Sequence, residues 1–283
     1  MRKRLGRFSK NRTVFLTLKG VHVLFVVSLI CAFFLSFAVI SFTRGCRTDG
    51  TKFPSKLAII IDDFGMQRKG VKEMLTLDCK LTAAIMPFLE YSEEDAILAA
   101  ENGKEVILHL PMQATTHDNW NHVGPRPFKV GQSEEEICQL LGEMLEDIPQ
   151  AVGANIHMGT ISSTKNEMML PILNCLKERG MYFVDSKTSA KSVCADVARQ
   201  TGIHFYENQV FLEHEQKSKA YVKKRLTKAM KIAIDKGSCI AIGHVGAEGG
   251  MITVQAIREM KNVFAENNVE LVWVSELSCG DNK

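Results

Sequence analysis

The sequence lacks several patterns that would assign it to a common class of protein. No two of its eight cysteines form a CxxC pair or have the spacing of a zinc knuckle, and it contains no internal repeat or low-complexity segment. Residues 51–283 also lack excess positive charge: residues 1–50 hold nine Lys/Arg and one acid, which leaves 26 Lys/Arg against 31 Asp/Glu. These absences exclude a repeat protein and give no electrostatic reason to expect nucleic-acid binding.

The N-terminal part has the features of a membrane anchor. Residues 1–19 carry seven Lys/Arg and no acid, and residues 20–42 contain no acid, Lys or Arg. Such a run can span a bilayer, which takes about 20 apolar residues, and the basic segment before it predicts that the remainder lies on the outer face. Two alternatives stay open: a cleaved signal peptide, whose apolar core is usually shorter, and a lipoprotein signal ending at Cys46.

We therefore expect four segments along the chain. Residues 1–19 form a basic cytoplasmic segment, 20–42 a transmembrane helix, 43–55 a linker and 56–278 the folded domain. Cysteines of the folded domain lie inside apolar patterns such as "GSCIAIGH", which is typical of buried thiols that act as small hydrophobic residues. We expect most of them to be unpaired, which in an exported protein indicates a reducing setting, although the sequence leaves room for a disulfide.

Apolar runs typical of strands alternate with helical patterns from residue 57 onward. The first run, "LAIII", is typical of a strand that is covered on both faces of a parallel sheet. The predicted strands are residues 57–61, 81–86, 105–110, 152–156, 181–185, 203–207, 239–244 and 269–274. Because each intervening helix can serve as a crossover, this alternation predicts an α/β fold whose parallel sheet closes into a deformed barrel of seven or eight β/α units.

Polar side chains stand at the carboxyl ends of these predicted strands. Barrels of this kind carry their chemistry at that edge. The residues are Asp62, Asp63, His109, Asn155, His157, Asp185, Glu207, Glu213, His244 and Glu276. Three of the eight histidines therefore fall at strand ends, and we expect a functional site there.

The residue types at this edge fit metal-assisted hydrolysis. Asp63, His109 and His157 would provide three protein ligands of mixed oxygen and nitrogen type with an open fourth position, as catalytic zinc sites have. Asp62 is the candidate general base, and His244, on the far side of the pocket, is the candidate general acid. This arrangement suits the hydrolysis of an amide or an ester.

Structural roles are the alternative for each of these residues. The two aspartates could cap a helix or a turn, and the histidines could be core residues bonded to backbone carbonyls. Asp185 could either cap the following turn or orient a site histidine. The remaining acids at strand ends are more often solvated, namely Glu207, Glu213 and Glu276.

Five segments in this order resemble the divergent polysaccharide deacetylases, a branch of the NodB-like carbohydrate esterases. They are "IIIDDFG", "ILHLPMQ", "GANIHMGT", "FVDSKTSA" and "AIGHV", and the resemblance covers roughly residues 55–277. It implies a deformed (β/α) barrel with a divalent metal, usually zinc, that removes acetyl groups from N-acetylated sugars of a cell-wall or related polymer. In that superfamily the first aspartate of the first motif is the base and the second binds the metal, which correspond to Asp62 and Asp63. The histidine of the last motif, here His244, is the general acid.

Two features depart from the superfamily pattern. Its two metal histidines lie four residues apart in one motif, whereas His109 is followed at that spacing by Gln113. We expect His157, from the next strand, to supply the missing ligand. The arginine-bearing motif of the better-known enzymes has no convincing counterpart here. The expected site is completed by a third catalytic residue, Asp185, and by three substrate contacts, Asn155, Met112 and Glu213.

The sequence thus predicts a membrane-anchored hydrolase of the bacterial cell envelope, with its folded domain outside the cytoplasm. We expect it to use a divalent metal, zinc being favoured, to remove N- or O-acetyl groups from an envelope polysaccharide. One alternative is a catalytically inactive glycan-binding or scaffold protein on the same fold. The other is a metal-dependent amidase or peptidase that acts on cell-wall peptides.

Overall fold

A parallel sheet of nine strands runs through the part of the chain that the computed structural model describes, residues 53–115, 123–213 and 215–278. The strands lie in the order β6-β5-β4-β3-β2-β1-β8-β7, and β9 also pairs with β1. Their bounds are β1 Ser55–Phe64, β2 Thr82–Ile85, β3 Glu105–Met112, β4 Gly153–Met158, β5 Tyr182–Asp185, β6 Phe205–Glu207, β7 Val210–Phe211, β8 Ser238–His244 and β9 Val269–Val272. All eight predicted strands are confirmed to within three residues at each end.

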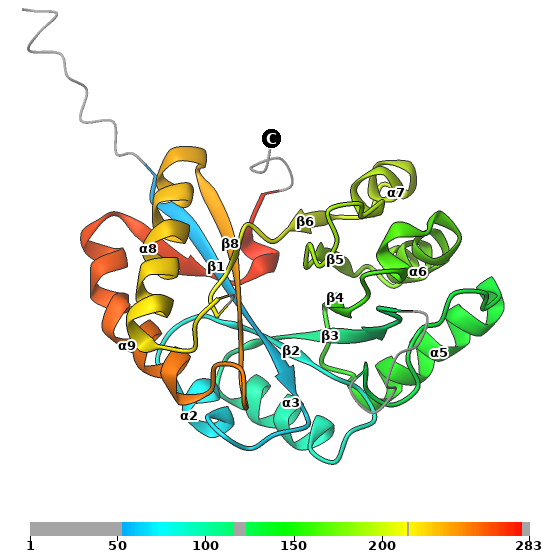
Figure 1. The fold of residues 1–283 in the computed structure, drawn as a ribbon, viewed down its shortest axis with the longest axis horizontal. Helices are drawn as coiled ribbons and strands as arrows, with labels where there is room; N and C mark the ends of the chain where they lie inside the picture. Colours follow the sequence, from blue (N-terminus) through cyan, green and yellow to red (C-terminus); the bar gives the residue numbers. More distant parts are fainter. Residues whose placement is uncertain (1–52, 116–122, 214, 279–283) are drawn as a thin grey trace, which may run out of the picture. The chain divides into compact units, whose positions relative to one another are not determined.

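Helices cover the outer face of the curled sheet (Figure 1). They are α2 Val71–Leu75, α3 Ser92–Glu101, α5 Glu134–Asp147, α6 Asn166–Glu178, α7 Cys194–Thr201, α8 Lys219–Lys236 and α9 Met251–Glu266, with 3-10 turns η1 Ser162–Thr164 and η2 Val274–Glu276. Helix α5 begins at Glu134 because Ser133 and Glu136 form a capping box there. This arrangement confirms the predicted alternation of strands and crossover helices.

The sheet curls into a half-barrel, and a short chain segment joins its two ends. Strand β6 pairs with β5 at one end, and β7 pairs with β8 at the other. Only Asn208 and Gln209 separate β6 from β7. The N–H of Asn208 donates to the carbonyl of Asp185, and that of Gln209 donates to the carbonyl of Ile240. The predicted barrel is therefore present as an open, deformed one.

Two apolar layers lie on the two faces of the sheet. Side chains that alternate along each strand fall into one layer or the other. Ala58 and Ile60 of β1 belong to a cluster that contains no residue of an α-helix, so this cluster fills the concave face. Leu57, Ile59 and Ile61 belong to a larger cluster that includes the apolar faces of the helices. The parity of a residue therefore decides whether its side chain points into the half-barrel or toward the helices.

The predicted membrane anchor lies outside the described residues. Within residues 53–115, 123–213 and 215–278, no helix combines the length and the apolar character that a bilayer crossing requires. The predicted basic segment, transmembrane helix and nearly all of the predicted linker precede these residues.

The cysteines of the described residues include one disulfide, a possibility that the sequence left open. Cys138 of α5 and Cys175 of α6 form a disulfide, with Cα atoms 5.9 Å apart. Three others in the described residues, Cys79, Cys194 and Cys239, are free thiols. Most of the cysteines in the described residues are therefore unpaired, as expected. The disulfide that the sequence left open could not be assigned from it, because only the packing of α5 against α6 brings together residues that are 37 positions apart in sequence.

Candidate metal and catalytic site

The end of β1 presents two consecutive carboxylates to the same site. Asp62 has the parity of Ala58 and Ile60, so its side chain points into the half-barrel, where it is almost fully buried. Asp63 has the opposite parity, but its backbone adopts a left-handed conformation with φ of 70°. The pairing of β1 with β2 also shifts register between Ile61 and Phe64. This local irregularity turns Asp63 back toward the site, as conformations of this kind often do at functional positions.

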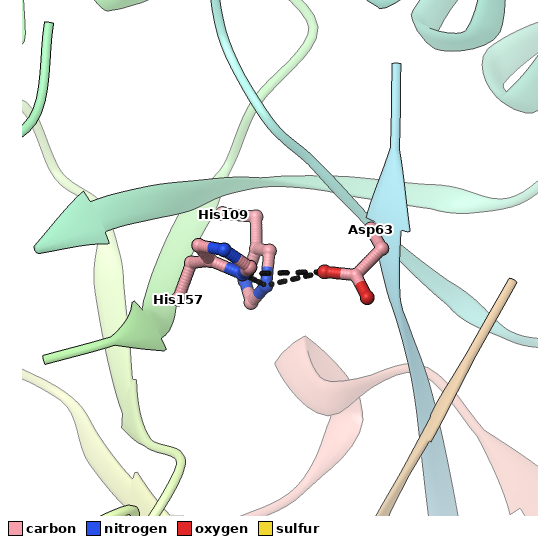
Figure 2. Close-up of side chains that lie close together, drawn as sticks. All are labelled: Asp63, His109 and His157. Carbon is pink, nitrogen blue, oxygen red and sulfur yellow. Dashed lines mark hydrogen bonds and ion pairs between the residues drawn. The ribbon is translucent and has the colours of Figure 1, made fainter. Parts of the chain in front are cut away.

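Asp63, His109 and His157 bring three ligand atoms together (Figure 2). Asp63 Oδ1 lies 3.4 Å from His109 Nε2 and 3.2 Å from His157 Nδ1, and the two nitrogens are 3.0 Å apart. Tetrahedral ligands at about 2.0–2.1 Å from a zinc ion would stand about 3.3 Å from one another. Asp63 Oδ1 is moreover buried without a hydrogen-bond partner of good geometry. These residues therefore fit a divalent metal ion.

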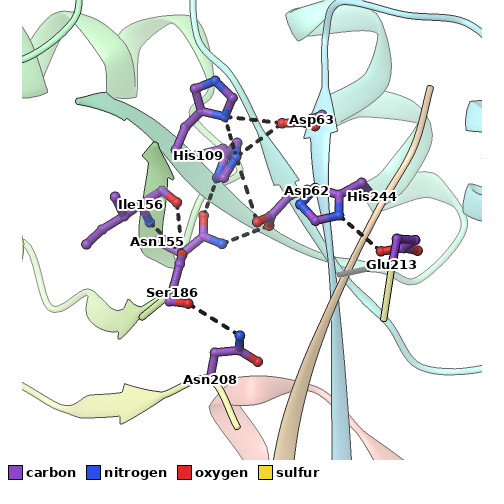
Figure 3. A network of polar contacts seen from close by, with 10 residues as sticks. Asp62, Asp63, His109, Asn155, Ile156, Ser186, Asn208, Glu213 and His244 are labelled. Carbon is purple, nitrogen blue, oxygen red and sulfur yellow. Dashed lines mark hydrogen bonds and ion pairs between the residues drawn. The ribbon is translucent and has the colours of Figure 1, made fainter. Parts of the chain in front are cut away.

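Asn155 holds two of the site residues in place (Figure 3). Its Nδ2 donates to Asp62 Oδ1 over 2.8 Å, and its Oδ1 lies 2.7 Å from His109 Nδ1. Because this oxygen can only accept, His109 carries its proton on Nδ1 and directs the lone pair of Nε2 toward Asp63. Asn155 was expected to contact substrate, but it is fully buried, so the structure gives it an orienting role.

The electrostatics of the cluster differ between its two aspartates. Burial raises the pKa of Asp62 and outweighs the opposing effect of His109 and His244. Burial acts on Asp63 in the same direction, yet its contacts with His109 and His157 hold its pKa well below the ordinary value. The carboxylate at the ligand position is therefore ionised, and its neighbour has the higher proton affinity of the two.

His244 lies on the other side of Asp62 and is paired with a buried acid (Figure 3). Its Nδ1 stands 3.1 Å from Glu213 Oε2, and Thr253 donates to the other oxygen of Glu213. Burial lowers the pKa of His244, but Glu213 and the site aspartates outweigh this effect and raise it to about 9. Glu213 was expected to contact substrate, or else to be a solvated acid. Its carboxylate is instead buried and directed at His244.

The structure does not bring Asp185 and Met112 into the cluster. Asp185 has the outward parity of Phe183, and its carboxylate accepts hydrogen bonds from Lys187 N at 2.8 Å and Ser192 Oγ at 2.7 Å. Asp185 therefore caps the turn that follows β5, which was the structural alternative for this residue. Met112 has no exposed surface and packs in the layer beneath the helices, which corrects the expectation that it meets substrate.

Two further acids at strand ends have surface partners. Glu207 pairs with Lys187 at 2.9 Å and Glu276 with Lys80 at 2.5 Å. This agrees with their alternative as solvated acids.

Two residues that hold the site were not recognised from the sequence. Thr253 of α9 supports Glu213. Asp95 of α3 is fully buried and accepts hydrogen bonds from the backbone N–H of Gly65, at 2.9 Å, and from Arg68. It therefore fixes the loop that follows Asp63. An acid among the buried residues of a helix was the available signal, because such acids are rarely buried without a partner.

The chain thus forms a curled parallel α/β half-barrel with an aspartate and two histidines at the carboxyl edge of its sheet. Residues 59–278 match the family model described as divergent polysaccharide deacetylase. The chain therefore belongs to the divergent polysaccharide deacetylase family.

Two curated proteins and one solved structure illustrate the similarity. The chain is 30% identical over 206 residues to the uncharacterized protein YibQ of Escherichia coli (strain K12), covering 73% of this chain and 63% of that protein. It is 28% identical over 205 residues to an uncharacterized protein of Haemophilus influenzae, covering 72% of each. The crystal structure of an uncharacterized protein from Agrobacterium tumefaciens C58 matches with a TM-score of 0.72 at 19% identity, covering 82% of this chain and 92% of that one.

Proposed function

We propose that this chain is a metal-dependent hydrolase that removes acetyl groups from a cell-envelope polysaccharide. One observation carries the proposal: the three converging ligand atoms of Asp63, His109 and His157 are flanked by Asp62 and His244 on a deacetylase-family fold. Zinc is the favoured ion because a set of one carboxylate and two imidazoles with an open position is typical of catalytic zinc sites.

The residues of this chain suit the proton transfers of acetyl removal. A divalent ion at this place would polarise the acetyl carbonyl and lower the pKa of water toward about 7. Asp62, held by Asn155 at 2.8 Å, would accept the proton of the attacking water. His244 would donate a proton to the departing amine or alcohol, and its raised pKa of about 9 keeps it protonated near neutral pH. Asn155 would keep both Asp62 and His109 in their working orientation.

We also propose that the folded domain works outside the cytoplasm, held by the apolar segment 20–42. The segment's composition and the basic residues before it support this placement. The disulfide between Cys138 and Cys175 supports it too, because disulfides persist mainly in oxidising compartments.

The proposal is tested by measuring acetate release from N-acetylglucosamine oligomers and from isolated cell-wall polymer, together with the metal content of the purified chain. We expect acetate and a free amino or hydroxyl group as products. Asp62→Asn should lower turnover by about 10²–10⁴-fold while the metal is retained, and Asp63→Ala should lose both. Full activity in either variant would contradict the assignment.

The products also separate the two alternatives. A cleaved peptide bond without acetate would indicate an amidase or peptidase with the same metal chemistry. Glycan binding by a folded chain that holds no metal after zinc is added would indicate a binding protein on a deacetylase fold.

A further inference from the structure

A groove of about 710 Å³ lies among the loops at the carboxyl edge of the sheet. Its walls come from the loops that follow β1, β2 and β3, so it opens at the same edge of the sheet as the ligand cluster. Met66 contributes from the β1 loop, three residues after Asp63. The volume of the groove is within the range of about 300–1,000 Å³ that is typical of ligand sites.

The β3 loop ties the groove to the strands that carry the metal ligands. The N–H of Phe128 donates to the carbonyl of Pro111 over 2.8 Å, and Pro111 is the register partner of His157. Gly124, which lines the groove, lies next to Pro111 and packs tightly on Met86: a Cβ there would be 3.5 Å from Pro111 Cγ and only 2.5 Å from Met86 Cε. The loop that lines the groove is therefore bonded to β3 at the position that pairs with His157.

An arginine stacked on an aromatic ring forms part of the wall of the groove. The guanidinium carbon of Arg126 lies 4.6 Å from the centroid of the Phe88 ring. Both residues adopt left-handed backbone conformations, with φ of 50° and 64°. Such conformations are unfavourable for residues other than glycine and persist where surrounding contacts impose them.

Two acids of helix α5 hold Phe88 and Arg126 in this geometry by hydrogen bonds. Asp147 accepts a hydrogen bond from the backbone N–H of Phe88 at 2.7 Å, and Glu143 accepts one from Nη2 of Arg126. An arginine carries five N–H donors, so the bond to Glu143 leaves others for a ligand. The stack is thus preorganised, which lowers the entropic cost of binding.

The charges and the apolar surface of the groove indicate what it binds. Its lining holds two positive charges, from Arg126 and Lys129, and one negative charge, from Glu90, and Glu143 outside the lining pairs with Arg126. The domain as a whole is acidic. Met66, which is 39% exposed, and Phe88 supply apolar surface of the kind that the faces of sugar rings contact. The combination fits a sugar that bears an anionic group.

We propose that this groove is the subsite for the sugar next to the one that is deacetylated, and that Arg126 binds a carboxylate carried by that sugar. The ring of this sugar lies against Phe88 and Met66, while its carboxylate accepts charge-assisted hydrogen bonds from the guanidinium. This subsite rests on the proposed deacetylase function and narrows its substrate to polymers with a carboxylate beside the acetylated unit.

The test measures binding by calorimetry in the full chain carrying Asp62→Asn, so that no acetyl group is removed meanwhile. Three tetrasaccharides serve as probes: neutral chitotetraose, a hyaluronan fragment with uronic carboxylates, and an N-acetylglucosamine and N-acetylmuramic acid fragment with ether-linked carboxylates. We expect at least one carboxylated probe to bind about tenfold more tightly than chitotetraose. Adding Arg126→Gln should abolish that preference, whereas Arg199→Gln, an exposed arginine paired with Asp196 on α7, should preserve it.

Three results would overturn the subsite: equal binding of all probes, equal weakening of all probes by Arg126→Gln, or no binding of any probe by the folded chain. Which carboxylated probe binds distinguishes a uronic acid from an ether-linked acid. Acetate release by the wild-type chain is measured separately on the same probes. Acetate release without a carboxylate preference would contradict only the proposed subsite. A carboxylate preference without acetate release would contradict only the proposed deacetylase function.

Discussion

His157 reaches the ligand cluster from β4, one strand away from His109, and its Nδ1 lies 3.0 Å from His109 Nε2. Gln113, which follows His109 at the spacing where related enzymes carry a second histidine, is occupied elsewhere. Its amide donates to Thr115 O and accepts from Val130 N in the loop after β3. In the proposed metal site, the third ligand would therefore come from a neighbouring strand and not from the same motif.

This difference predicts opposite effects for two substitutions. His157→Ala should weaken metal binding by more than about 100-fold, because loss of even an outer partner of a ligand lowers affinity 10–100-fold. Gln113→Ala should leave one metal ion per chain. Metal titration of both variants, with unfolding curves as a control for folding, checks the prediction. A metal-free Gln113→Ala variant beside a metal-loaded His157→Ala variant would place the third ligand in the β3 loop.

Glu213 and His244 predict a specific pH dependence. His244 has a pKa of about 9, so we expect it to lose its proton, and activity to fall, as the pH rises through that value. Glu213→Gln removes an anion that stabilises the imidazolium, so the pKa of His244 should fall and the alkaline limb should move to lower pH. The pH profile of kcat/KM measures this shift, with metal content as the control. An unchanged alkaline limb in Glu213→Gln would show that another group sets it.

At the scale of elements, α3 holds the loop that follows Asp63, a proposed metal ligand. Asp95 is buried and binds both Gly65 and Arg68, whereas Glu94 beside it meets the same Arg68 on the exposed surface. Asp95→Ala would leave the Gly65 N–H and the guanidinium without their partner. We expect it to lower the free energy of unfolding by about 2 kcal/mol and to weaken metal binding, because the turn that orients Asp63 is released.

Glu94→Ala is the matched control for Asp95→Ala. It removes a surface ion pair of the same arginine, which typically contributes about 0–1 kcal/mol, and it should leave metal affinity unchanged. Chemical denaturation and metal titration check both variants. Equal effects of the two substitutions would mean that Arg68, and not the buried carboxylate, organises the loop.

The strands show how far the sequence could predict this site. Period-two alternation places Asp62, His109, Asn155 and His244 on the inner face, together with the apolar residues before them. That these four side chains lie close together could be predicted from their positions at strand ends alone. The same rule, applied to Asp185 and Met112, would have placed both on the outer face. The left-handed turn at Asp63 could not be predicted in this way, because it depends on a register shift between β1 and β2. Strand β7, two residues long, is too short for any periodicity.

At the scale of the whole molecule, the disulfide between α5 and α6 joins two helices of the outer layer. It closes a loop that contains β4 with the proposed ligand His157, and α5 supports Phe88 and Arg126 of the groove. Two features depend on contacts between segments that are far apart in sequence. One is that the sheet stays an open half-barrel, and the other is the pairing of Cys138 with Cys175. Local patterns therefore indicated the elements but neither the closure of the sheet nor the disulfide.

The disulfide predicts both a stability difference and a cellular one. For a sequence separation of 37 residues, loop-closure entropy gives a stabilisation of up to about 4 kcal/mol, so Cys138→Ser with Cys175→Ser should lower the melting temperature, as should a reductant. Cys79→Ala, which removes a free thiol, should lower it far less. The chain taken from cells is then alkylated and analysed by mass spectrometry. If the domain lies outside the cytoplasm, Cys138 and Cys175 should become alkylated only after reduction. Cys79 should not be found in a disulfide with either of them. Full alkylation of both without reductant would contradict the oxidising location, and an unchanged melting temperature in the double variant would show that α5 and α6 are held by packing alone.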